Sequence, residues 1–394
     1  MPDNENEKDD DLLEGVYQGE IQLELQRHPV RDFKPWHKPR KHYIRIHQWC
    51  ELVRELIEEA DIQKGATLTY LGMPGEDFLD VRSVHGVCER AHVRLRYLGF
   101  DSTAPGDGYE LNLSNHEVCS LPYVDPASLV LRDRLENLAK NQSMASFRTR
   151  RFGPFDVLNV DLCDCVGGVG KEGYFATLQR LFEMQLQARV KPWLLLIATK
   201  AERPDIDVGV KAKLLGCIRR NILDNPGFAA ALEEKLALTD EGLAAEGEAR
   251  IDLQHMHLVN AFVLGLGKWM LQLLMGGRPP IKVALRSGFS YRVGFEEPNM
   301  VSLAFWMQPL VQLAEDQSGI VPQTDLVPTL PTEHELAQEL VEAVQRIRDV
   351  DRLLHDSPEL MQRMIQKSGE LLTTARYSIE DYKRWVVKNT PNIK

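Results

Sequence analysis

The sequence has no G-x-G-x-x-G motif, no internal repeat and no apolar run long enough to cross a membrane. Its most apolar stretch, residues 262–275, is shorter than the roughly 20 residues that a membrane span needs and contains Lys268, so we expect a buried helix. The N-terminus carries acidic residues where a secretory signal would have an apolar core. We therefore expect a cytoplasmic protein that makes no contact with a membrane.

Cysteine is scarce, with six residues scattered over 394, which excludes a disulfide framework. Cys163 and Cys165 are closer together than the cysteines of usual structural zinc sites. His255 and His257 would point in different directions from a helix, so we predict no metal site. The net charge of -11 excludes a protein whose whole surface binds polyanions, although local basic patches remain candidates.

Apolar runs alternate with amphipathic stretches, which predicts a doubly wound, mostly parallel α/β sheet covered by helices. The predicted strands are residues 66–72, 93–101, 155–164 and 192–200, followed by 281–287, 289–295 and 300–307. The predicted helices within this region are residues 76–91, 125–141 and 173–190. An N-terminal helix is expected over residues 43–60.

The composition divides the chain into four parts. Residues 1–20 are predicted to be a disordered acidic tail, and 21–62 a basic arm with the N-terminal helix. Residues 63–318 form the α/β domain, with a helical insertion at 208–280 that breaks near Asn225. A proline-rich linker then leads into a helical extension, 319–394, whose helix starts are signalled at Thr332, Ser357 and Ser378.

The stretch TYLGMPGEDF contains a glycine turn between the first strand and the next helix. Gly72 and Gly75 would let backbone amides approach an anionic or nucleotide-like ligand, or they serve only a tight turn. Asp101 ends the second strand, where an acid typically accepts hydrogen bonds from ribose hydroxyls. The alternative is that Asp101 caps the turn formed with Ser102 and Thr103.

This layout of a glycine turn, an acid ending the second strand, an acidic fourth strand and a final strand pair resembles the class I (Rossmann-like) S-adenosylmethionine-dependent methyltransferase superfamily. The resemblance covers about residues 43–309 and implies a seven-stranded sheet with an N-terminal helix and a C-terminal helical extension. It also implies S-adenosylmethionine as the cofactor.

The resemblance assigns a role to each matching position. Gly72, Pro74 and Gly75 would hold the amino-acid part of the cofactor, and Asp101 its ribose. Asn115 would line the adenine pocket, with Asn112 as the alternative. Asp161 and Asp164, which end the fourth strand, would face the methyl group and orient the nucleophile. The two carboxylates are therefore the candidate catalytic residues.

The sequence departs from the family pattern at the end of the first strand. Tyr70 and Leu71 stand where the family usually has an acid, and Glu76 or Asp77 would have to replace it. We therefore weigh two functions: a methyltransferase, and a catalytically inactive scaffold or sensor subunit of a bacterial defence or modification complex. A nicotinamide oxidoreductase is a third reading, which the missing third glycine argues against.

Two basic stretches and the C-terminal helices are candidate interaction surfaces. The arm from Arg27 to Arg45 could bind nucleic acid or pair with the acidic tail. Arg148, Arg150 and Arg151 form a second basic group beside aromatic residues. The C-terminal helices could dock a partner protein, although we expect them to pack on the chain's own core.

Overall fold

A computed structural model describes residues 31–102, 108–168, 173–248, 253–310 and 330–389. The chain divides into two compact units, Met1–Lys34 and Pro35–Lys394. Every described helix and strand lies in the second unit. The predicted acidic tail and most of the proline-rich linker fall outside the described residues.

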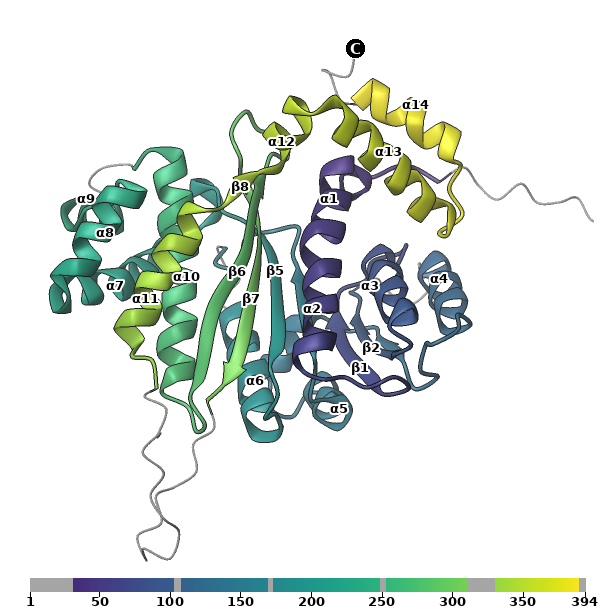
Figure 1. The fold of residues 1–394 in the computed structure, drawn as a ribbon, viewed down its shortest axis with the longest axis horizontal. Coiled ribbons are helices and arrows are strands. Elements are labelled where there is room, and N and C mark those ends of the chain that lie inside the picture. Colours follow the sequence, from purple (N-terminus) through teal and green to yellow (C-terminus); the bar gives the residue numbers. More distant parts are fainter. Residues whose placement is uncertain (1–30, 103–107, 169–172, 249–252, 311–329, 390–394) are drawn as a thin grey trace, which may run out of the picture. The chain divides into compact units, whose positions relative to one another are not determined.

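One sheet organises the second unit, with the strand order β3-β2-β1-β4-β5-β7-β6-β8 (Figure 1). β1 to β5 are parallel, and β7 lies antiparallel between β5 and β6. The strands are β1 (Thr67–Gly72), β2 (Arg94–Phe100), β3 (Leu129–Leu131), β4 (Val157–Asp161), β5 (Trp193–Lys200), β6 (Ile281–Tyr291), β7 (Met300–Pro309) and β8 (Arg348–Asp349). The doubly wound, mostly parallel sheet is therefore confirmed, although the described sheet has eight strands where seven were expected.

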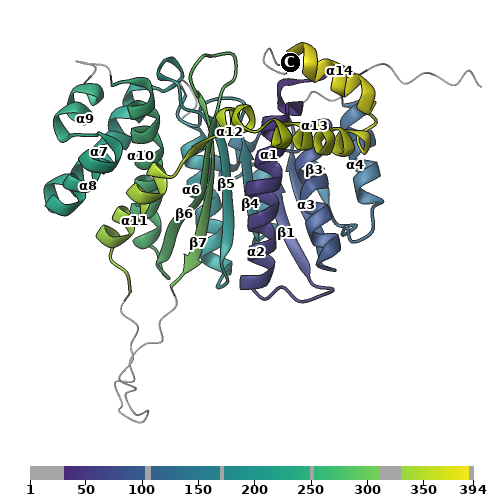
Figure 2. The ribbon, with the colours of Figure 1, turned by 45° about the horizontal axis from the view of Figure 1, so that its top comes forward.

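Helices cover both faces of the sheet (Figure 2). One face carries α1 (Pro39–Ile44), the π-helix η2 (Arg45–Cys50), α2 (Glu51–Glu59), α3 (Leu79–Arg90), α4 (Tyr109–Cys119), α12 (Val350–Asp356), α13 (Pro358–Thr373) and α14 (Ile379–Asn389). On the other face lie η3 (Leu135–Ala139), α5 (Met144–Phe152), α6 (Gly173–Ala188), α7 (Val208–Asp224), α8 (Pro226–Leu236), α9 (Asp240–Gly247), α10 (His255–Met275) and α11 (Glu333–Gln345). Two short 3-10 turns, η1 (Pro35–His37) and η4 (Arg203–Asp205), complete the described elements.

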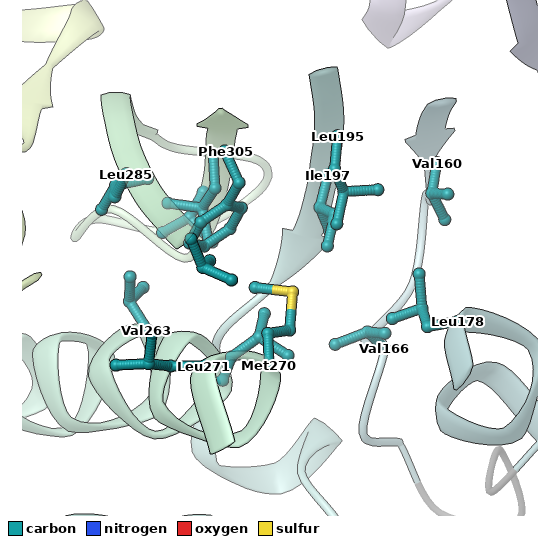
Figure 3. Close-up of a cluster of buried hydrophobic side chains, with 14 of the residues drawn as sticks. Val160, Val166, Leu178, Leu195, Ile197, Val263, Met270, Leu271, Leu285 and Phe305 are labelled. Carbon is teal, nitrogen blue, oxygen red and sulfur yellow. The ribbon is translucent and has the colours of Figure 1, made fainter. Parts of the chain in front are cut away.

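Helix α10 is the centre of the larger core. Val263, Met270 and Leu271 meet Leu285 of β6 and Phe305 of β7, and all five side chains are buried (Figure 3). α10 is long and apolar enough to cross a membrane, but 72% of its most apolar window is buried inside the protein. The prediction of a buried helix over residues 262–275 is therefore confirmed.

The N-terminal helix is continuous but contains a π-helical segment, η2, in its middle. Gln48 of η2 is fully buried, and its amide donates to the carbonyl oxygen of Ser302 (3.0 Å) while its side-chain oxygen accepts from the Ser302 hydroxyl (2.6 Å). It also donates to Ser287 at the β-bulge of β6. A buried amide is stable only with such partners, so Gln48 fixes the helix across β6 and β7.

Three element predictions were wrong. Residues 125–141 do not form a helix: they hold β3 and η3, and helices lie instead at α4 and α5. The Asp125-Pro126 pair starts a turn there, and Leu129–Leu131 pairs with β2. Residues 281–287 and 289–295 are not two strands, since β6 runs through a bulge near Arg286 to Tyr291. The helix expected from Glu76 begins only at Leu79, because Phe78 adopts a left-handed conformation (φ 56°).

The predicted helix starts in the C-terminal extension are confirmed. Thr332 and Glu335 form a capping box, Ser357 caps α13 before Pro358, and the Ser378 hydroxyl accepts from the amide of Asp381. Asn225 caps α8 at the predicted break. α11 packs on α10 and β6, and α13 packs on α1, so these helices cover the chain's own core as expected (Figure 1).

The close approach of α7 to α10 gives a test of the packing. A methyl group added at Gly265 of α10 would lie 2.9 Å from Leu214 Cβ and 3.0 Å from its carbonyl oxygen, and backbone atoms cannot move aside. We expect Gly265→Ala to lower the free energy of unfolding by about 1–3 kcal/mol. Gly216→Ala on α7 is the control: among the described residues no atom lies within 4 Å of where its side chain would begin, so it should be neutral or stabilise by up to about 1 kcal/mol. Denaturant unfolding checks both; equal effects would contradict the packing argument.

Candidate functional site

A cavity of about 540 Å³ lies at the carboxyl ends of β1 and β4. From these two neighbouring strands the chain proceeds in opposite directions, to β2 and to β5, which makes this the switch point where open α/β sheets bind ligands. Its walls come from the N-terminal helix, the turn after β1, the end of β4 and the β6–β7 connection: Pro35, Trp36, Lys38, Arg40, Lys41, Arg45, Met73, Pro74, Gly75, Glu76, Asp77, Leu79, Asp80, Asp161, Leu162, Cys163, Tyr291, Arg292, Val293, Gly294 and Met300.

The turn after β1 forms one rim of the cavity. Gly75 has a left-handed backbone (φ 59°), a conformation that favours glycine, and no atom of the described residues lies within 4 Å of where its side chain would begin. Gly72 has a different reason for lacking a side chain. A Cβ there would lie 2.6 Å from the ring of Tyr70, two residues earlier on the same side of β1.

Tyr70 lies at the centre of a buried polar chain beneath the cavity. Its hydroxyl accepts from the Asn159 amide of β4 (2.8 Å) and donates to Asp80 Oδ2 of α3 (2.7 Å). Burial, followed by the Asp80 charge, raises the pKa of Tyr70 well above its usual value, so the hydroxyl stays protonated. Both β-strand residues point to the face of the sheet that carries the N-terminal helix.

Two side chains of opposite charge in this cavity have unused hydrogen-bonding atoms. Asp80 is 5% exposed; burial raises its pKa, and although the Val81 amide favours its ionised form, no donor reaches Oδ1 in hydrogen-bond geometry among the described residues. Arg45 is also 5% exposed, and its Nε has no acceptor within the described part of the chain, while its Nη1 donates to the carbonyl oxygen of Trp36 (3.3 Å). Burial lowers the pKa of Arg45, and the Asp161, Asp80 and Asp77 charges oppose that shift.

The N-terminal helix contributes a second buried cation. Lys41 Nζ lies 2.6 Å from Asp161 Oδ1 at the end of β4 and 4.9 Å from the centre of the Trp49 ring. Burial acts to lower the pKa of Lys41, but the Asp161 carboxylate outweighs it and the pKa is raised. This ion pair joins the helix to β4. The π-helix begins at Arg45, four residues after Lys41, and such segments are frequent at functional sites.

The C-terminal extension holds the arm against the turn after β1. The Asp77 carboxylate contacts His37 Nε2 (2.8 Å) and accepts from the Tyr377 hydroxyl (3.2 Å). The Tyr382 hydroxyl donates to the carbonyl oxygen of His37 (2.8 Å). Arg376 pairs with Glu110 of α4 (2.8 Å), so residues after α13 link the arm, the turn and α4. Asp77 is therefore engaged within the protein.

The structure brings some of the predicted site residues together. Pro74, Gly75 and Asp161 line the cavity, and Gly72 directly precedes its wall. Asp101 follows β2 and is not among the lining residues. The ring of Pro74, which lines the cavity, lies 3.0 Å from where a Cβ would stand on Gly99 of β2.

The remaining predicted residues lie elsewhere. Asn115 is in α4, where its side-chain oxygen accepts from the Tyr97 hydroxyl (2.7 Å). Asp164 accepts from the amide of Cys165 (2.9 Å) in the turn beyond β4, and it does not line the cavity. The resemblance assigned these side chains to loops that follow strands. Asn115 instead lies in α4, a helix that the sequence analysis did not predict.

The prediction that the arm binds nucleic acid stays a prediction, and several of its described cations are engaged within the protein. Lys41, His42 and Arg45 are buried, and Arg40 pairs with Asp351 of α12 (3.0 Å). Arg27 lies outside the described residues. These cations therefore face the protein's own carboxylates and the cavity rather than solvent.

No group of three or more potential metal ligands occurs among the residues that the structure describes. Cys163 is exposed and Cys165 buried, and all six cysteines are free. His255 contacts the carbonyl oxygen of Pro298 (2.7 Å).

Sequence reasoning missed Asp80, Asn159, Lys41 and Arg45 as members of this site. Asp80 lies one turn beyond the two acids that we considered, and the late start of α3 aims it inward. Asn159 had a visible signal, since an amide inside an apolar strand that ends at Asp161 requires a buried polar partner.

Comparison with protein-family models matches residues 30–387 to the family described as PP_RS20740-like. The chain belongs to this family. A comparison with curated proteins returns no match.

Among solved structures, the chain is similar to TrmN from Thermus thermophilus, at 12% identity and a TM-score of 0.27, over 69% of this chain and 53% of TrmN. This chain thus aligns with about half of TrmN. It is also similar to loganic acid methyltransferase with SAH, at 10% identity and a TM-score of 0.28, over 71% of this chain and 99% of the other. TM-scores this low say nothing about ligand or activity. The assignment of the fold rests on the strand order and directions of the sheet.

His42, next to Lys41, predicts a pH dependence of stability. Burial, followed by the Arg45 charge, lowers the pKa of His42 to about 3. In the unfolded chain His42 is therefore protonated below about pH 6.5, whereas in the folded chain it stays neutral. The free energy of unfolding consequently falls as the pH drops below that value. At pH 5 this residue should cost about 2 kcal/mol relative to pH 7.5.

Urea unfolding of the wild type and His42→Gln at both pH values measures this cost. His42→Gln should lose less stability on acidification by about 2 kcal/mol. His116→Gln, at an exposed histidine, serves as the control and should behave as the wild type. The same acid sensitivity in His42→Gln and the wild type would rule out His42 as the source.

Proposed function

We propose that this protein binds S-adenosylmethionine in the switch-point cavity, with the amino-acid end of the cofactor between Arg45 and Asp80. The observation that carries the proposal is the pair of unused buried atoms, Arg45 Nε and Asp80 Oδ1, on opposite charges lining one cavity. A carboxylate could accept from the first and an ammonium donate to the second, which is the charge pattern of an amino acid.

The remainder of the cavity suits a nucleoside. Its volume of about 540 Å³ is in the range of small-molecule sites, and Trp36, Leu79, Leu162 and Met300 give it apolar walls. Asp101 stays our candidate for the ribose hydroxyls, which would require the nucleoside to reach past Pro74 toward β2. Substitution of Asp101 tests that route separately.

As a methyltransferase, the bound cofactor would supply a methyl group on an already reactive sulfonium, so the protein's contribution would be positioning and water exclusion. Asp161 is the candidate for orienting the acceptor's nucleophile. Lys41 would hold this carboxylate in position, since the two form a 2.6 Å ion pair. Asp164 remains a candidate only for an acceptor that extends beyond the end of β4.

A catalytically inactive scaffold or sensor is the second candidate, and two observations favour it. The Tyr70 ring occupies the space next to Gly72, and the Pro74 ring packs over Gly99. The two rings therefore occupy space beside β1 and β2 where the resemblance would place the cofactor. We place this alternative in a bacterial multi-protein defence or modification complex.

Isothermal titration calorimetry with S-adenosylmethionine and S-adenosylhomocysteine separates the candidates. Asp80→Asn and Arg45→Met should each weaken binding by about 10-fold or more, because each removes a charged hydrogen-bond partner. Glu89→Gln, at an exposed acid of α3 that does not line the cavity, is the control and should bind as the wild type. Asp101→Ala weakens binding only if the ribose reaches β2.

Thermal melts of every variant establish that the fold is intact. No heat with either ligand, from a folded wild type, would reject cofactor binding and leave the scaffold. Heat with NAD under the same conditions would instead support the oxidoreductase reading.

A further inference from the structure

Helix α5 presents a stripe of large apolar and basic side chains to solvent. Met144, Phe147, Arg148 and Arg151 recur at i, i+3, i+4 and i+7, and all are exposed, as is Arg150. The opposite side of the helix is buried and consists of Ala145, Ser146, Thr149 and Phe152. The helix is thus buried on one side and exposed on the other, and we call its exposed residues the α5 stripe.

The apolar part of the α5 stripe is large for a surface helix. Met144 is 60% and Phe147 62% exposed, and they lie on the same side of a nine-residue helix. Isolated exposed apolar residues need no explanation, but an aromatic residue flanked by arginines has the composition of a binding surface.

The arginines of the α5 stripe lack compensating charge. Within the described parts of the chain, Arg148, Arg150 and Arg151 make no ion pair or hydrogen bond. Acids close by in the sequence are already engaged: Asp156 pairs with Arg189 (2.6 Å) and Glu136 with Arg134 (3.2 Å).

A further cation packs against the buried side of α5. The guanidinium carbon of Arg96 on β2 lies 4.2 Å from the centre of the Phe152 ring. The local excess of positive charge contrasts with the net charge of -11 of the whole chain. A polyanion would be attracted to this face specifically.

We propose that the α5 stripe binds single-stranded nucleic acid, with phosphates on Arg148, Arg150 and Arg151 and a base stacked on Phe147. Guanidinium groups bind phosphate oxygens bidentately, and aromatic rings accept unpaired bases of any sequence. A membrane surface fits less well, because two apolar side chains offer little area for insertion.

The proposal is independent of cofactor binding. α5 leads into the start of β4, whereas the cavity lies beyond the end of β4, and none of the stripe residues lines it. It also differs from the sequence-based expectation for the arm, whose described cations are largely buried or paired.

Fluorescence anisotropy with fluorescein-labelled oligo(dT) and oligo(U) of about 20 nucleotides tests the proposal on the full chain. The variant is Arg148→Gln/Arg150→Gln/Arg151→Gln. The matched control removes three exposed charges elsewhere, as Lys213→Gln/Arg363→Gln/Lys388→Gln. Both triple variants have the same net charge, so any difference between them reflects location.

The α5 triple variant should bind at least about 10-fold more weakly, and its log–log salt slope should be shallower by about 2, since each phosphate contact on a single strand contributes about 0.7. Phe147→Ala should weaken binding about 5-fold or more without changing that slope. The control should bind as the wild type. Stronger binding of oligo(U) than of oligo(dT), or the reverse, identifies RNA or DNA as the partner.

Three results would overturn the proposal. The wild type could fail to bind either oligonucleotide at low salt. The two triple variants could lose affinity equally, which would attribute binding to the net charge of the protein and not to the α5 stripe. Sedimentation with anionic phosphatidylserine vesicles, abolished by the α5 variant in the absence of oligonucleotide binding, would assign the stripe to a membrane.

Discussion

The arrangement depends on two cations buried at the carboxyl ends of β1 and β4. Lys41 and Arg45 project from the N-terminal helix into a region where isolated charges are unstable. They persist because Asp161, Asp77 and Asp80 converge there from β4, the turn after β1 and α3. Because an unpaired buried charge is costly, the N-terminal helix, β4, the turn after β1 and α3 must meet here. Removing either the cations or the carboxylates would leave the opposite charges uncompensated.

This constraint explains why the chain ends cover the site. The N-terminal helix must lie across the sheet for its cations to reach β4, and Gln48 fixes it over β6 and β7. The C-terminal helices then hold the start of that helix through Tyr377, Tyr382 and their contacts with His37 and Asp77. The extension is consequently part of the site's construction, not an appendage to the α/β sheet.

The sequence predicted the layers of the fold because its signals are local. Apolar runs marked the long strands, and the caps at Thr332 and Ser357 marked helix starts. The failures needed information from distant residues: Leu129–Leu131 is a strand only because β2 pairs with it. The site was predicted in part, through Gly75 and Asp161. Asp80 and Arg45 could not be paired from the sequence, since only the fold brings α3 under the N-terminal helix.

Tyr70 decides how the glycine turn is interpreted. Gly72 is small because the Tyr70 ring needs its space, so that glycine alone is no evidence for a ligand. The case for cofactor binding rests instead on the buried hydrogen-bonding atoms of Asp80 and Arg45 that have no described partner. Each unsatisfied buried group costs about 1–3 kcal/mol. A pure scaffold would be as stable or more so with apolar residues at these positions. A zwitterionic ligand would satisfy both groups at once, which gives this costly arrangement a physical purpose.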